Sequence, residues 1–219
     1  MRLYKFYSAR WAREALDRKR LKISTLSDIN DPFEFGALSA STKEERAALN
    51  RSRCGLMKNK GIVSFSDSWK SPLLWSHYAD NHAGIALGFD VAPDLLTKIT
   101  YPKDKPKLSD FLRENGELDP TVGTLAASVK ANEWAYEREH RLILGISDPK
   151  DRVSGLHFVE FGDKIKLKEI IFGANYQSLN DQLWTDELVG QGVIFTTARM
   201  AFGSFEIVKQ KQKSSCKIL

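Results

Sequence analysis

The stretch "KANEWAYEREHRLIL", residues 130–144, places Glu137 and Glu139 directly before a run of Leu, Ile and Leu. In an extended chain alternate side chains share a face, so Glu137, Glu139 and Arg141 would point the same way. In a helix, Glu137 and Arg141 would instead be neighbours on a solvated surface. We predict the extended form, with a strand over residues 138–145, because the apolar run is typical of a buried strand.

Period-two patterning and turn residues extend this prediction to the rest of the chain. The other predicted strands of the central sheet cover residues 2–7, 61–66 and 84–90, and a helix is predicted over residues 72–80. Strands and helices do not alternate regularly, which favours an α+β fold with a mixed or largely antiparallel sheet. We therefore expect one domain over residues 1–210, with a helical or loop excursion near 91–130, and a polar tail over 211–219.

Composition limits the class of protein. The 219 residues carry a formal net charge of +5 and a sequence pI near 9.1, which favours anionic partners such as nucleotides or nucleic acid. Only two cysteines occur, Cys54 and Cys216, and neither forms a C-x-x-C pair, so disulfide and zinc frameworks are not expected. No stretch is long and apolar enough to span a bilayer. These features predict a cytoplasmic protein with no membrane partner.

Five segments resemble a bacterial family known as domain of unknown function 2971. They are "LYKFYS" (3–8), "INDPFE" (29–34), "SFSDSWKSPLLWSHYADNHAGIALGFD" (64–90), "EWAYEREHRLIL" (133–144) and "KEIIFGA" (168–174). The family name itself implies no chemistry.

The order of these pieces is also similar to the layout of ADP-ribosyltransferase folds. That resemblance implies a split sheet, flanked by helices, that binds NAD as a substrate. Lys5 would take the first-strand place usually held by His or Arg, and Glu139 would be the late glutamate that engages the ribose. Tyr78 or Trp75 would stack on the nicotinamide.

The residues predicted around the NAD follow from this resemblance and from the high density of polar and aromatic residues in two segments, around 30–31 and 75–78. The predicted set is Lys5, Tyr7, Asn30, Asp31, Ser64, Ser66, Trp75, His77 and Tyr78. We expect Trp75, His77 and Tyr78 to line a cleft together with Asn30 and Asp31. A structural alternative stays open for the "NDPFE" turn, in which Asp31 caps the backbone while Phe33 and Phe35 pack.

The two glutamates suit transfer from NAD. An oxocarbenium-like ribose develops positive charge, which the Glu139 carboxylate would stabilise, and Glu137 would accept the proton of the acceptor. The alternative is that Glu137 and Glu139 only balance the charges of Lys130, Arg138 and Arg141.

Three functions follow from these patterns. The first is an NAD-dependent ADP-ribosyltransferase-like enzyme, of bacterial or phage-defence type, that acts on nucleic acid or protein. The second is a non-catalytic nucleotide- or nucleic-acid-binding module. The third is a metal-dependent nuclease that uses Asp31, Glu34, Glu137 and Glu139. No metal site is predicted at His77 and His82, because two histidines five apart do not share a helical face.

Overall fold

The computed structural model describes residues 1–25, 31, 33, 36–113, 118–119, 121–146, 152–153, 155–177 and 188–211, without the side chains of 56–59 and 152–153. The chain is α+β, and its strands pair mostly antiparallel. It divides into two compact units, each built from separate stretches of sequence. Unit 1 comprises Met1–Arg20, Ser66–Ala92 and Glu160–Leu219, and unit 2 comprises Leu21–Phe65 and Pro93–Val159.

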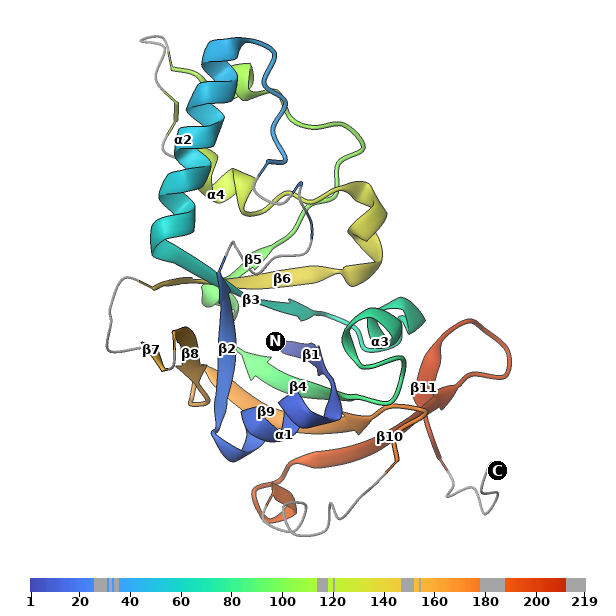
Figure 1. Ribbon diagram of the computed structural model, residues 1–219. Helices are drawn as coiled ribbons and strands as arrows, with labels where there is room; N and C mark the ends of the chain where they lie inside the picture. The colour runs from blue at the N-terminus through green and yellow to red at the C-terminus, as the bar shows by residue number, and fades with distance from the viewer. Residues whose placement is uncertain are drawn as a thin grey trace. The chain divides into compact units, whose positions relative to one another are not determined.

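The named elements in the described part of unit 1 are strands of the sheet and helices α1 and α3 (Figure 1). Its elements are β1 (Arg2–Tyr7), α1 (Ala9–Asp17), α3 (Pro72–Tyr78), β4 (Ile85–Val91), β9 (Ile165–Phe172), β10 (Ile194–Met200) and β11 (Ile207–Lys209). The strand order is β11-β10-β9-β4-β1. Only β9 and β10 run parallel, and the other neighbours are antiparallel.

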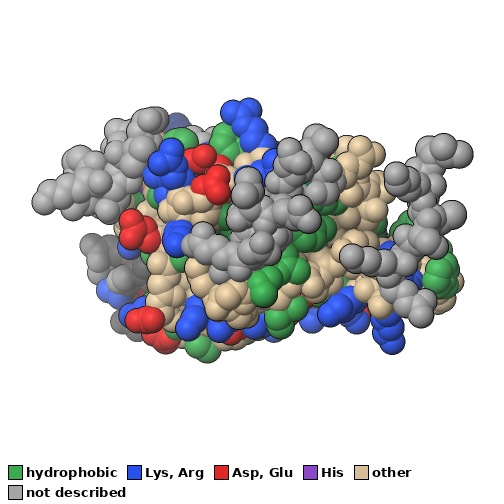
Figure 2. Space-filling view, turned by 90° about the horizontal axis from the view of Figure 1, so that it is seen from below, with side chains coloured by type: hydrophobic (Ala, Val, Ile, Leu, Met, Phe, Trp, Pro, Cys, Tyr) green, Lys and Arg blue, Asp and Glu red, His purple; other side chains and the backbone are tan. Residues whose placement is uncertain are grey.

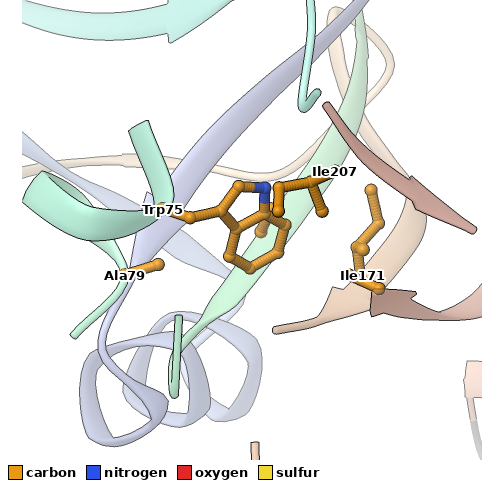
Figure 3. Close-up of a cluster of buried hydrophobic side chains, with 6 residues drawn as sticks. Trp75, Ala79, Ile171 and Ile207 are labelled. Atoms are coloured by element: carbon orange, nitrogen blue, oxygen red, sulfur yellow. The ribbon is translucent and has the colours of Figure 1, made fainter. Parts of the chain in front are cut away.

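Helix α3 supplies the centre of the core of unit 1. Its apolar residues Leu74, Trp75 and Ala79 are buried, as the four-residue spacing of Trp75 and Ala79 predicts for one helix face. Trp75 and Ala79 point toward Ile171 and Ile207 from the sheet (Figure 3). The Trp75 ring also meets the Phe6 ring edge-to-face, with 5.1 Å between centroids.

A close approach of backbones fixes the turn between α3 and β4. A Cβ atom added to Gly84 would lie 2.1 Å from the carbonyl oxygen of Tyr7 and 2.8 Å from the backbone of Ala79. Only glycine fits in this space, so Gly84 lets β4 start directly against β1.

Unit 2 contains more, shorter elements. They are β2 (Arg20–Thr25), α2 (Lys43–Asn59), β3 (Lys60–Ser66), η2 (Pro93–Leu95), β5 (Leu96–Lys98), η3 (Leu108–Phe111), α4 (Val122–Ala126), η4 (Asn132–Glu137), β6 (Glu139–Gly145), β7 (Arg152–Val153) and β8 (Leu156–Glu160). Strand β3 pairs with both β2 and β6, and β6 also pairs antiparallel with β5. The first residue of β2 and the last residues of β3 and β8 lie at the boundaries of unit 1.

Helix α2 begins with a reciprocal cap. The Glu45 backbone N–H donates to Thr42 Oγ1 at 3.0 Å, and the Thr42 N–H donates to Glu45 Oε2 at 3.1 Å. Such a capping box satisfies two amides that would otherwise lack partners at the helix start. Helices α2 and α4 lie side by side (Figure 1), next to a small core that contains Leu38, Leu108 and Val122.

The secondary structure confirms the predicted strands to within one residue at each end. The predicted helix over 72–80 is α3, which ends two residues earlier, because Asp80, Asn81 and His82 all have positive φ angles between 48° and 70°. Most of the expected excursion, residues 93–130, belongs to unit 2. Residues 212–219 of the expected tail lie outside the described residues.

Figure 2 shows charged side chains scattered over one face. Among the coloured residues there, Lys and Arg side chains are interspersed with hydrophobic and acidic ones. Within the described part of the chain, no helix has the length and apolar character that a membrane crossing requires.

Candidate functional site

The two glutamates of the opening stretch lie on either side of a sharp turn. Glu137 is the last residue of η4, and Glu139 is the first residue of β6. Between them Arg138 has a φ of 48°, in the left-handed region that is uncommon for a side chain other than glycine. The strand prediction is confirmed for residues 139–145. It is wrong for Arg138, because this turn ends the helix and redirects the chain into the strand.

Lys130 brings the two carboxylates together. Its ammonium nitrogen lies 2.6 Å from Glu137 Oε2 and 3.6 Å from Glu139 Oε2. All three side chains are buried, with at most 7% of each exposed. The ammonium also lies 4.7 Å from the centroid of the Trp134 ring, which supplies a cation–π contact on another side.

Arg141 binds Glu139 through two parallel hydrogen bonds. Arg141 Nε and Nη2 donate to the two carboxylate oxygens at 2.8 and 2.9 Å, and Nη1 donates to the Ala127 carbonyl oxygen at 2.9 Å. Alternation along β6 places Glu139 and Arg141 on the same face, as expected for an extended chain. A two-pronged pair of this kind fixes the plane of the Glu139 carboxylate.

Two further side chains hold the start of β6. The Glu139 backbone N–H donates to the Tyr101 hydroxyl oxygen at 2.8 Å. The Ser64 hydroxyl, on the neighbouring strand β3, hydrogen-bonds the Glu139 carboxylate. We call Ser64, Tyr101, Lys130, Glu137, Glu139 and Arg141 the buried ion cluster.

Burial and the opposite charges nearby shift the pKa values of this cluster in opposite directions. Burial raises the pKa of Glu139, and Glu137 adds to the rise, whereas Lys130 and Ser64 oppose it. Burial pulls the pKa of Lys130 down, but Glu139 and Glu137 more than offset this, so that the pKa lies above its usual 10.5. Burial lowers the pKa of Arg141 to about 9, and Asp31 opposes this fall. With Glu139 at 2.8 and 2.9 Å, the guanidinium stays charged at neutral pH.

Asp31 is buried and acts electrostatically on Arg141. Its Oδ1 accepts a hydrogen bond from the Phe33 backbone N–H at 2.8 Å, which confirms the capping turn predicted as the structural alternative. The packing predicted for Phe33 is wrong, since this side chain is 59% exposed. The buried Oδ2 atom of Asp31 has no hydrogen-bond partner among the described residues. Asn30, Glu34 and Phe35 lie outside the described residues.

Comparison with known protein families identifies the segment that carries most of this cluster. Residues 74–142 match the family model described as Protein of unknown function (DUF2971). The resemblance seen in the sequence is confirmed over these residues. No curated protein and no solved structure matches the chain.

The DUF2971 match covers five of the six cluster residues, since Tyr101, Lys130, Glu137, Glu139 and Arg141 all fall within 74–142. It also covers residues 74–78 of α3 and the whole of β4 in unit 1. Lys5, Asp31 and Ser64 precede it. The matched segment therefore carries the core of the cluster, and β3 contributes Ser64 from outside it.

Six of the residues predicted around NAD belong to unit 1. Trp75 is fully buried, and its indole N–H donates to the Trp69 carbonyl oxygen at 2.6 Å. Its ring is covered by the core (Figure 3), whereas Tyr78 is half-buried beside the exposed His77 in the DUF2971 segment.

The remaining unit 1 residues have local partners. Lys5 Nζ lies 5.6 Å from the centroid of the Tyr7 ring, and burial raises the pKa of the Tyr7 hydroxyl. Ser66 Oγ donates to the Ser68 carbonyl oxygen at 2.9 Å and accepts from the Ser68 N–H at 3.2 Å. The cleft predicted for Trp75, His77 and Tyr78 with Asn30 and Asp31 stays a prediction.

Sequence reasoning missed Tyr101 and treated Lys130 only as a balancing charge. Tyr101 is 38 positions from its partner Glu139, and Lys130 is seven positions from Glu137. A separation of 38 is no helix or strand period, and a separation of seven puts two residues on one face only of a helix that contains both, whereas the helical segment here begins after Lys130, at Asn132. The only available signal was the type of side chain: a tyrosine and a lysine occur in segments that precede the paired glutamates within the DUF2971 match.

The described residues contain no metal-binding group, and a cavity in unit 1 is lined by residues other than those of the predicted site. Among the described residues, no group of three His, Cys, Asp or Glu side chains is placed to hold a metal ion. Unit 1 contains a cavity of about 320 Å³ that includes none of the predicted site residues. It is lined by Leu16, Lys19, Phe161, Gly162, Asp163, Ile165, Lys166, Leu167, Leu188, Gln191 and Val193.

Proposed function

We propose that the chain is an NAD-dependent ADP-ribosyltransferase-like enzyme in which Glu139 engages the ribose of NAD. One observation carries the proposal: the Ser64 hydroxyl on β3 hydrogen-bonds the Glu139 carboxylate at the start of the adjacent β6. This juxtaposition fits the places that the resemblance to ADP-ribosyltransferase folds assigns to a second-strand serine and a late glutamate.

In the proposed reaction the glycosidic bond of NAD breaks, and nicotinamide leaves with the bonding electron pair. The C1′ atom of the ribose then bonds to the nucleophile of the acceptor, which loses a proton. Glu139 stabilises the positive charge that develops on the ribose, and Glu137 accepts the proton. Arg141 and Ser64 fix the Glu139 carboxylate beforehand, so little reorganisation accompanies the reaction.

A second candidate is a nucleotide- or nucleic-acid-binding module without catalysis. The observation that favours it is that Glu139 is only 4% exposed and has both oxygens bonded to Arg141. The charge of the Glu139 carboxylate is therefore already neutralised by the Arg141 guanidinium. Under this candidate the buried ion cluster stabilises unit 2 and takes no part in chemistry.

The experiment that separates the two candidates measures nicotinamide release from NAD by the purified chain and by a Glu139→Gln variant. Glu133→Gln is the matched control, since Glu133 is exposed in the same segment. Under the enzyme proposal Glu139→Gln loses nicotinamide release and Glu133→Gln keeps it. Under the binding-module candidate neither protein releases nicotinamide, while a nucleotide or polyanion still raises the melting temperature.

A further inference from the structure

The β10–β11 hairpin of unit 1 ends in an exposed apolar turn. Met200, Phe202 and Phe205 are 73%, 97% and 100% exposed. We call these three residues the aromatic tip, after its two phenylalanines. The hairpin is well formed below the tip, because Met200 pairs with Ile207 and the Ala201 N–H donates to the Glu206 carbonyl oxygen at 2.9 Å. It lies at the sheet edge formed by β11 (Figure 1). Large apolar side chains grouped in this way mark an interaction surface.

The β10–β11 hairpin that carries the aromatic tip is rich in positive charge. Residues 199–211 contain Arg199, Lys209 and Lys211 against a single acidic residue, Glu206, which lies 3.8 Å from Lys70. The charge of Glu206 is thus already balanced. The hairpin therefore presents a net positive surface, which is complementary to an anionic partner.

Arg199 joins the charged and aromatic parts of this surface. Its guanidinium carbon lies 4.8 Å from the centroid of the Phe202 ring, and Nη1 donates to the Met200 carbonyl oxygen at 2.7 Å. The cation is therefore positioned beside the ring before any partner binds. An aromatic face next to a fixed guanidinium suits a ligand with flat rings and regularly spaced anions.

We infer that the aromatic tip is a docking surface for single-stranded nucleic acid. Unpaired bases stack on Phe202 and Phe205, and the phosphates between them contact Arg199, Lys209 and Lys211. A duplex fits less well, because its bases are already stacked on one another. The inference concerns unit 1 and is independent of the chemistry proposed for Glu139.

The test is the affinity of the full chain for a fluorescein-labelled dT20 oligonucleotide, measured by fluorescence anisotropy at several salt concentrations. We expect the double variant Phe202→Ser/Phe205→Ser to bind at least tenfold more weakly. We expect Lys209→Gln/Lys211→Gln to lower the slope of log affinity against log salt. Melting temperatures should stay unchanged, because the substituted side chains are exposed.

Trp11→Ser is the matched control. Trp11 is also an exposed aromatic residue of unit 1, at 56%, with the Arg10 guanidinium carbon 5.0 Å from its ring centroid. The Trp11→Ser variant should bind dT20 with the same affinity as the unsubstituted chain. An equal loss of affinity in Trp11→Ser, or no loss in the double phenylalanine variant, would overturn the inference.

Other occupants give distinct results, each of which also overturns it. Binding to vesicles of phosphatidylglycerol and phosphatidylcholine that depends on both phenylalanines, without binding to dT20, identifies a lipid surface. Self-association that the double variant abolishes, without binding to dT20, identifies a second copy of the chain as the occupant.

Stacking of the bases on the two phenylalanines is checked by NMR. The Phe202 and Phe205 ring protons should shift upfield with dT20 and not with inorganic polyphosphate.

Discussion

Glu139 and Arg141 form a two-pronged ion pair although they are only two residues apart on one strand, with N–O distances of 2.8 and 2.9 Å. Both side chains are almost fully buried, with 4% and 1% exposed. The pair thus lies in the interior of unit 2, where each side chain depends on the other for its counter-charge.

Replacing Arg141 by Met should lower the free energy of unfolding by about 3–5 kcal/mol, because Glu139 would stay buried without its main counter-charge. Urea denaturation followed by circular dichroism measures this change. The double variant Glu139→Leu/Arg141→Met should recover much of the loss, since it buries no unpaired charge. A double variant less stable than Arg141→Met would contradict this account of the pair.

Replacing Glu139 by Gln should reduce nicotinamide release by about 100-fold if the proposed function is correct. The burial of the pair adds an expectation that the sequence did not give: the same change should cost about 1–3 kcal/mol of stability, because Arg141 loses a charged acceptor. Activity must therefore be measured at a temperature where circular dichroism shows both proteins folded.

Glu137→Gln should reduce transfer to the acceptor more than nicotinamide release, since its proposed partner is the proton of the acceptor. Comparing the rates of the two products in one reaction mixture gives this ratio. Equal losses of both products would assign Glu137 to the ion cluster alone.

The Arg2–Asp90 pair gives a prediction for pH. Arg2, whose Nε lies 2.8 Å from Asp90 Oδ1, holds the pKa of that carboxyl below its usual 3.8. A carboxyl with a lowered pKa in the folded state stabilises the fold above its unfolded pKa, and this contribution is lost as pH falls through the folded pKa. The stability difference between the unsubstituted chain and Asp90→Asn should therefore be full at neutral pH and shrink below pH 3.8.

Both side chains of this pair are partly exposed, so the difference should stay below about 1 kcal/mol and decrease in high salt. Urea midpoints of the two proteins across acidic pH measure it. A difference that grows toward low pH would have the wrong sign.

Gly84→Ala should destabilise unit 1 by about 1–3 kcal/mol or more, because the new methyl group would meet the Tyr7 carbonyl oxygen at 2.1 Å. Gly203→Ala is the control, since no atom lies within 4 Å of its added Cβ. That variant should change the free energy of unfolding by no more than about 0.5 kcal/mol. Thermal denaturation of both variants measures the two effects. Equal losses of stability at the two positions would refute the steric explanation.

The sequence predicted the strands well because their residue types follow a period of two. The period of two belongs to the residue types and not to the observed burial: Arg2–Tyr7 has one buried residue, Leu3, and the first four residues of Glu139–Gly145 are all buried, yet the structure places strands in both segments. The turn at Arg138 was missed, because a left-handed backbone at an arginine leaves no mark in residue type. It is this turn, and not strand alternation alone, that lets Glu137 and Glu139 meet at Lys130.

The candidate site was predicted only in part. The paired glutamates were visible as a motif, and Ser64 belonged to the set predicted around NAD, but Tyr101 comes from a distant segment that only the fold brings to Glu139. Trp75 is fully buried in the core of unit 1, and its predicted stacking on nicotinamide stays a prediction.

The carboxylates buried in unit 2 outnumber its buried lysine and arginine. Among its described residues, Asp31, Glu137 and Glu139 are buried carboxylates and Lys130 and Arg141 are buried cations, and the histidines His140 and His157 are buried as well. One oxygen of Asp31 lacks a hydrogen-bond partner among the described residues. A cationic group that enters this interior would be held there by Coulomb attraction that water screens only weakly. Burial and the charge of Glu137 raise the pKa of Glu139, so this carboxyl should take up a proton on folding at pH values between its unfolded and its folded pKa, which calorimetry in buffers of different ionisation enthalpy can detect.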